Sequence, residues 1–150
     1  MGTFSSHPFG NDTALDLCDL FSELDDQEKS RHLTSIFENA LNPKPGEYVW
    51  TDEVIAAAAL IALVLPGGGS VVSVEDAELD LDSDAEAEEE WYPALLHQPS
   101  NEVVALANRA LRHVTGTATK WYANWLNDSV RSEAVGRIDR ISAVLRTALP

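Results

Sequence analysis

Apolar residues recur every three or four positions along most of the chain, which predicts a succession of amphipathic helices. The first helix is predicted to begin after a cap at Asn11 or Asp12, and the second after Asp25, which forms a capping-box pattern with Glu28. The stretch NPKPG at 42–46 ends the second helix, because proline lacks an amide hydrogen and disfavours helix in the preceding residue. The expected inward faces are Ala14, Leu17, Cys18, Phe21 and Leu24, then Leu33, Ile36, Phe37, Ala40 and Leu41.

A third helix, predicted from Thr51 or Asp52, is apolar on every side. Its first turn carries acids, which the helix dipole favours at that end. Twelve apolar residues then run from Val54 to Leu65 before PGGG stops the helix. At about 1.5 Å per residue they span roughly 18 Å, against about 30 Å of bilayer hydrocarbon. A membrane span is therefore not expected, and this helix is predicted to be the buried centre of a bundle.

The last third of the chain predicts three more helices. Ser100 caps the first, a short aromatic helix follows Gly116, and the last runs from about Asp128 to Ala148, with Glu133–Arg137 spaced for an exposed ion pair. The expected inward faces are Val103, Leu106, Ala107, Ala110, Leu111 and Val114, then Val130, Ala134, Ile138, Ile141, Leu145 and Ala148. The short helix carries Ala118, Trp121, Tyr122 and Trp125. Residues 1–150 thus predict one all-α domain, a compact bundle of five or six helices around 54–65, with a Gly-rich and then acidic mobile loop at 67–90.

Negative charge is concentrated in the front and middle of the chain. The net charge is -15, and residues 75–90 hold ten carboxylates without one Lys, Arg or His. Such a chain is a poor candidate for direct contact with nucleic acid or an anionic membrane. If charge serves the function, the partner is a basic protein.

The acidic run alternates strictly, because every even-numbered residue from 76 to 90 is an acid. A calcium loop of the EF-hand type fails on register, since a loop starting at Asp80 puts Ala85 where glycine is needed. Nucleic-acid mimicry would need a rigid scaffold that this composition does not provide. A solvated connector is the favoured interpretation. Docking onto a cationic surface is the functional alternative, through Asp76, Glu78, Asp80, Asp82, Asp84, Glu86, Glu88 and Glu90. The cationic surface could also be internal, formed by Arg109, Arg112, Arg131, Arg137 and Arg140.

No catalytic or cofactor-binding motif stands out elsewhere. The four histidines lack metal-site spacing, and Ser70 lacks the setting of a nucleophile or a phosphate loop. Weak metal candidates are Asp12, Asp16 and Asp19, which share the polar face of the first helix with Glu23. That face is more simply explained as solvated. Trp121 and Trp125 are expected in the core, with interface anchoring as the alternative.

The opening MGTFSSHPFGNDTALD resembles the start of a bacterial family named domain of unknown function 4259. Members begin Met-Gly-x-Trp-Gly-x-Gly-x-Phe-Asp-Asn-Asp-x-Ala-x-Asp. The matching residues are Met1, Gly2, Phe9, Asn11, Asp12, Ala14 and Asp16, whereas Phe4, Ser5, His7 and Gly10 depart from the pattern. The resemblance implies a small, mostly helical bacterial protein of the cytoplasm and no established activity. The missing acid at Gly10 weakens the metal hypothesis.

Three classes of function remain, and a non-catalytic module that docks a basic protein leads them. An immunity or antitoxin-like role is one form of that hypothesis. The alternatives are a carboxylate- or metal-dependent enzyme using Asp12, Asp16 and Asp19, and a structural homo-oligomer subunit joined through Trp121 and Trp125. The lone Cys18 excludes an internal disulfide, which fits a reducing, cytoplasmic compartment.

Overall fold

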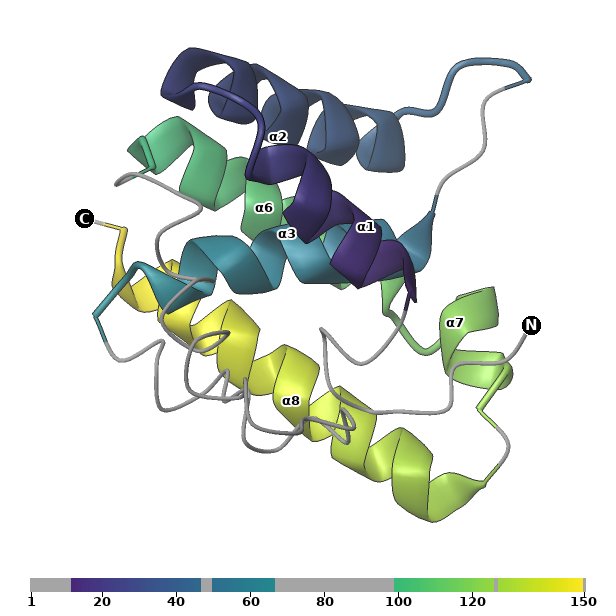
Figure 1. Cartoon of the computed structure of the whole chain (residues 1–150). Helices are drawn as coiled ribbons and strands as arrows, with labels where there is room; N and C mark the ends of the chain where they lie inside the picture. Colours follow the sequence, from purple (N-terminus) through teal and green to yellow (C-terminus); the bar gives the residue numbers. More distant parts are fainter. Residues whose placement is uncertain (1–11, 47–49, 67–98, 126, 150) are drawn as a thin grey trace, which may run out of the picture.

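Six α-helices make up the described part of the chain, in a computed structural model that places residues 12–46, 50–66, 99–125 and 127–149. With the labels of Figure 1, they are α1 (Asp12–Phe21), α2 (Asp26–Leu41), α3 (Thr51–Leu63), α6 (Asn101–Val114), α7 (Lys120–Ala123) and α8 (Asp128–Thr147). These residues include no strand. The prediction of a compact all-α bundle is confirmed.

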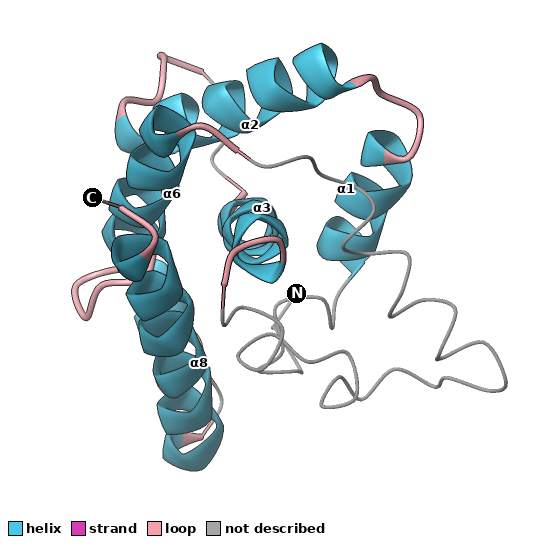
Figure 2. Ribbon diagram, turned by 90° about the vertical axis from the view of Figure 1, so that its left-hand side faces the viewer, coloured by secondary structure: helices cyan, strands magenta, loops and turns pink. Residues whose placement is uncertain are grey.

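Helix α3 is the centre of the bundle, as its uniformly apolar sequence predicted. It packs against α1, α2, α6 and α8, and Figure 2 shows it end-on with these helices around it. Every residue from Val54 to Ala62 is buried, and those from Ala56 to Ala62 have no exposed surface. Alanine allows this, because its single methyl group leaves neighbouring helices room to approach closely.

The central helix ends two residues before the apolar run does. It ends at Leu63, and Val64 and Leu65 form a turn in which their amides donate to the carbonyls of Ile61 and Ala62 at 3.2 and 3.1 Å. Pro66 explains this end, since a proline disfavours helical conformation in the residue before it.

The first two helices form where the sequence indicates, although α1 ends at Phe21, before the predicted helical residues Glu23 and Leu24. The capping box is present: the Glu28 amide donates to Asp25 Oδ1 at 2.8 Å, and the Asp25 amide donates to Glu28 Oε1 at 3.3 Å. The predicted inward faces are buried at Ala14, Leu17, Cys18, Phe21, Leu33, Ile36, Phe37 and Ala40, with Leu24 and Leu41 partly buried.

Helix α6 joins the N-terminal helices to α8. Ser100 caps it by accepting a hydrogen bond from the Val103 amide at 3.3 Å, as predicted. The helix packs on α2, α3 and α8. Its predicted inward residues are buried except Leu106, which is partly buried, and Val104 joins them.

The aromatic helix is shorter than its residue spacing suggested. Helix α7 has four residues, and Trp125 lies beyond its end. Asn127 then caps α8 by accepting from the Val130 amide at 2.8 Å. The chain must therefore leave one helix and enter another between Ala123 and Asp128, which stops α7 early.

Helix α8 forms the predicted Glu133–Arg137 ion pair, with Nη2 and Oε1 3.3 Å apart. The expectation that both partners are exposed is wrong. The Glu133 side chain is 54% exposed but that of Arg137 is 10% exposed, because it lies on the buried side near Ala134 and Ile138. No helix among the described residues is long and apolar enough to cross a membrane.

Candidate functional site

Exposed carboxylates line α1, the turn after it and the start of α2. We call this set the acidic surface: Asp16, Asp19, Glu23, Asp25, Asp26 and Glu28. No Lys, Arg or His occurs between residues 12 and 28. Leu20, 38% exposed, lies on α1 between two of these acids in sequence. The acidic surface therefore combines negative charge with an exposed apolar side chain.

The turn after α1 changes the position of one predicted residue. Glu23 was expected on the helical face, but α1 ends at Phe21 and the Glu23 amide bonds the Leu20 carbonyl at 3.0 Å. Ser22 also donates to the Asp19 carbonyl at 2.6 Å. Ser22 and Glu23 thus bond back onto the last turn of α1. Glu23 therefore lies in the turn between α1 and α2.

One member of the acidic surface is held in its charged form. Hydrogen bonding from the Glu28 amide lowers the pKa of the Asp25 carboxyl, and the Arg31 guanidinium acts weakly in the same direction. A carboxylate that accepts backbone N–H bonds is stabilised relative to its neutral form. Asp25 thus stays ionised at any physiological pH.

In the part of the chain that the structure describes, no metal donors come together around the weak candidates. Asp16 and Asp19 are exposed, and the side chain of Asp12 lies outside what the structure describes. Among the described residues no group of three or more His, Cys, Asp or Glu side chains is placed to hold a metal ion.

Trp121 and Trp125 pack on each other in an edge-to-face arrangement, with ring centroids 5.7 Å apart and planes at 87°. Trp125 is 7% exposed, and Trp121 is partly buried against the core. The Trp125 indole Nε1 is buried without a hydrogen-bond partner among the described residues. These positions favour core packing over interface anchoring. The other predicted docking residues, Asp76 to Glu90, lie outside the described residues.

The arginines proposed to receive the acidic run internally are mostly engaged elsewhere. Arg112 pairs with Asp139 across α6 and α8, and Arg131 pairs with Asp128 at 2.8 Å. Arg137 pairs with Glu133, as described above. Of the five arginines, only Arg109 and Arg140 form no ion pair with another described residue, so neighbouring acids already neutralise part of the predicted receiving surface.

Two carboxyls in the first turn of α3 lie in an unexpected environment. Burial raises the pKa of Asp52, and it raises the pKa of Glu53 with partial compensation from His32. No described side chain caps this helix end, and Trp50 beside it is 58% exposed. The sequence indicated only a favourable dipole interaction here. The burial could not be foreseen, because it depends on neighbouring helices.

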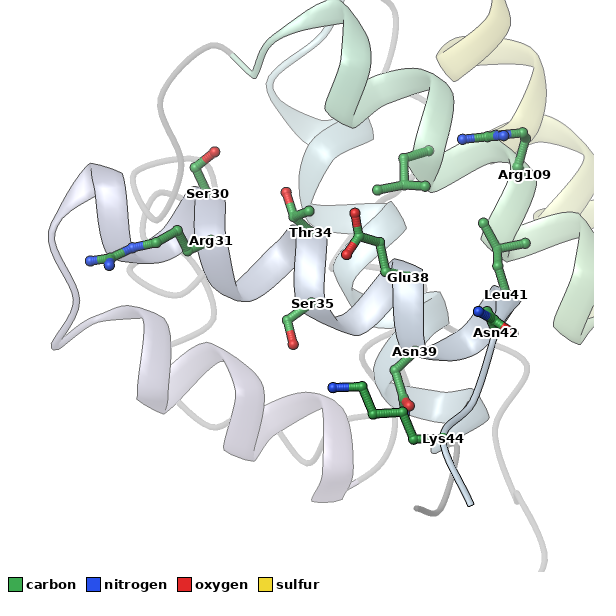
Figure 3. Close-up of a pocket in the computed structure, with 11 residues that line it drawn as sticks. Ser30, Arg31, Thr34, Ser35, Glu38, Asn39, Leu41, Asn42, Lys44 and Arg109 are labelled. Carbon is green, nitrogen blue, oxygen red and sulfur yellow. The ribbon is translucent and has the colours of Figure 1, made fainter. Parts of the chain in front are cut away.

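A groove of about 680 Å³ lies along α2, the loop after it and α6. We call it the α2–α6 groove. Its lining includes three cations, Arg31, Lys44 and Arg109, and one acid, Glu38. Figure 3 shows Arg109 projecting from α6, whereas Arg31 and Glu38 project from α2. Sequence reasoning missed this groove, because nothing in the sequence indicates that Arg109 lies next to residues of the second helix.

The chain belongs to the family described as Domain of unknown function (DUF4259), whose family model matches residues 2–134. This match confirms the resemblance carried by the opening residues. No curated protein and no solved structure matches the chain. The family brings no activity with it, so a function must be argued from the surfaces described above.

Proposed function

We propose that this protein is a non-catalytic binding module that docks a basic protein through its acidic surface. The supporting observation is the stretch of residues 12–28, which places six exposed carboxylates on α1, the turn after it and the start of α2 without a single base. The acids between Asp76 and Glu90 are a second anionic element in this proposal. An immunity or antitoxin-like role in a bacterial cytoplasm is one form of it.

Charge and apolar contact make different contributions to such an interface. Carboxylates that lie within a Debye length of one another, about 8 Å at physiological salt, act jointly on an approaching cation. They accelerate association and favour basic partners, and added salt weakens the effect. Leu20 supplies apolar contact area inside the charged surroundings, as interface centres usually require.

Two residues that could serve as nucleophile and base, Cys18 and His32, are better explained by packing than by catalysis. Cys18 is buried, and burial raises the pKa of its thiol to about 12, whereas reactive cysteines have lowered values. His32 packs edge-on against Phe21 with ring centroids 5.6 Å apart. Both side chains contribute to the contact between α1 and its neighbours, which supports a binding module over an enzyme.

The test is recovery of a basic partner from the native host at low and moderate salt. The variant Asp16→Asn/Asp19→Asn removes two charges from the acidic surface, and Glu38→Gln/Glu102→Gln removes two exposed charges elsewhere. We expect the first variant to recover less partner and to show a flatter salt dependence, with the second variant unchanged. Equal recovery by both variants would contradict the proposal.

A deletion of residues 75–90 separates the two anionic elements. If this deletion weakens binding further when combined with Asp16→Asn/Asp19→Asn, both elements contact the partner. If it changes neither the fold nor the recovery, the acidic run is a connector and the acidic surface alone is the docking element. Leu20→Ser should accelerate dissociation and leave the salt dependence as it is.

A further inference from the structure

A second cavity lies between α6 and α8, on the side of α3 that faces away from α1 (Figure 2). We call it the α6–α8 cavity. Its volume is about 430 Å³, and its described lining is wholly polar: Asn108, Arg112, Asp139, Ser142 and Arg146. The contact between two packed helices normally buries apolar side chains, so this row of polar groups is suited to a polar occupant.

Two hydrogen bonds across the α6–α8 cavity fix the order of its residues. The buried Ser142 hydroxyl donates to Asn108 Oδ1 at 2.5 Å, and Arg112 Nη1 donates to Asp139 Oδ1 at 2.5 Å. Arg112 follows Asn108 in sequence, whereas Asp139 precedes Ser142, so the two helices are antiparallel, as Figure 1 shows. Arg146 follows Ser142 and therefore lies at the opposite end of the cavity from Arg112. Each arginine is four residues, or about 6 Å along its helix, from the Asn108–Ser142 hydrogen bond.

The cavity offers accessible hydrogen-bond donors along its whole length. The Arg146 side chain is exposed and forms no ion pair or hydrogen bond with another described residue. Asn108 accepts through Oδ1, and its Nδ2 atom keeps accessible surface and has no partner among the described residues. Arg112 gives Asp139 one of its five N–H groups, and both side chains of this pair are more than half exposed. A ligand can therefore reach a guanidinium at each end and an amide donor between them.

The surroundings of the α6–α8 cavity are cationic, although the whole chain has a net charge of -15. Residues 101–149 contain seven Lys and Arg against four acids. Asp139 is the one acid among the described lining residues, and Arg112 compensates its charge. Helix α3, about 10 Å across, separates the cavity from α1, so the acids of α1 lie beyond the Debye length of about 8 Å. An anion in the cavity responds mainly to the two arginines.

We propose that the α6–α8 cavity binds a short aliphatic dicarboxylate. One carboxylate would pair with Arg146, and the other would accept from the Arg112 N–H groups that Asp139 does not use. The planar fork of a guanidinium matches a carboxylate through two parallel hydrogen bonds. Asn108 Nδ2, between the arginines, would donate to either carboxylate. A compact anion reaches one arginine only, whereas a ligand with two carboxylates joined by a short chain reaches both.

The experiment uses the full chain and four probes in calorimetric titrations: glutarate, butyrate, glutaramide and sulfate. Butyrate lacks one carboxylate and should bind about tenfold more weakly than glutarate, because a hydrogen bond between charged groups is lost. Glutaramide has the same length without charge and should not bind. Sulfate has the same charge as glutarate in a compact ion, so it separates attraction by charge alone from recognition of two carboxylates. It should bind no more tightly than butyrate.

Charge variants locate the binding. Arg146→Gln and Arg112→Gln should each weaken glutarate binding by about tenfold and reduce it to the affinity of butyrate, since each removes the partner of one carboxylate. Arg140→Gln, an exposed arginine of α8 outside the cavity lining, is the matched control and should change nothing. Circular dichroism confirms that each variant is folded. The proposal is overturned if millimolar glutarate gives no saturable binding, if sulfate binds as tightly as glutarate, or if Arg140→Gln weakens binding as much as Arg146→Gln.

Discussion

The Arg131 guanidinium on α8 lies 5.0 Å from the centroid of the Tyr122 ring on α7, and its Nε donates to the Tyr122 carbonyl at 2.9 Å. The same side chain pairs with Asp128 and reaches the Trp125 carbonyl at 3.5 Å. Arg131 therefore links α7 and the following segment with Trp125 to the beginning of α8.

Replacing Arg131 should loosen this corner of the bundle. Arg131→Ala is expected to lower the free energy of unfolding by about 1–2 kcal/mol, because carbonyls and a ring face lose a charged donor. Arg131→Lys should recover only part of this, since an ammonium group cannot reproduce the planar fork of donors. Urea unfolding followed by tryptophan fluorescence measures both. Arg140→Ala, exposed on the same helix, should stay within about 0.5 kcal/mol of the parent.

Replacing a buried alanine of α3 by a larger residue should destabilise the protein. Ala58→Leu is expected to destabilise the protein by about 1–3 kcal/mol or more, because the residue has no exposed surface and helices pack around it. Thermal unfolding by circular dichroism gives the effect. Ala123→Leu on the exposed side of α7 adds the same atoms without crowding and serves as control. Equal stability of the two variants would show that α3 has free space beside it.

Cys18 should be inert while the protein is folded. Burial raises the pKa of its thiol to about 12, so the thiolate needed for reaction is scarce at neutral and mildly alkaline pH. Ellman's reagent should titrate no thiol in the native protein near pH 8 and one thiol in denaturant. A Leu20→Cys variant places a second thiol on the exposed side of the same helix, and that thiol should react at once. Rapid native labelling of Cys18 would refute its assigned burial.

The pH dependence of stability should reveal the partly buried carboxyl of Asp52 at the start of α3. Burial raises the pKa of Asp52 above its ordinary value, near 4, so the unfolded state releases this proton first and stability falls as pH rises through that region. Asp52→Asn should therefore raise the melting temperature near pH 7, and the difference should shrink below about pH 4. A lower melting temperature for Asp52→Asn near pH 7 would mean that the helix dipole outweighs burial here.

Most of the helices could be predicted from short-range features of the sequence. The Asp25–Glu28 capping box and the Ser100 cap appear where the sequence places them, because capping depends on neighbours three residues apart. The predictions of helix ends failed where the end depends on packing against another helix. The spacing of Trp121 and Trp125 suggested one helix, but the approach to α8 ends α7 before Trp125.

The surfaces were predictable only in part. The sequence placed Asp16, Asp19 and Glu23 of the acidic surface on one polar face, and the preferred interpretation of that face was a solvated one. The α2–α6 groove depends on α2 packing against α6, and no periodicity reports which two helices meet. Burial of Arg137 was also missed, because an i, i+4 pair is usually a sign of exposure.

The alanine-rich centre makes α3 a reporter for the whole molecule. Its buried residues from Ala56 to Ala62 are covered from several directions by helices that are distant in sequence. A local opening of any one of those helices leaves the others in place, so the amides of α3 stay protected from solvent until the bundle comes apart as a unit. Hydrogen exchange at these seven positions would then proceed at nearly one common free energy, equal to that of global unfolding.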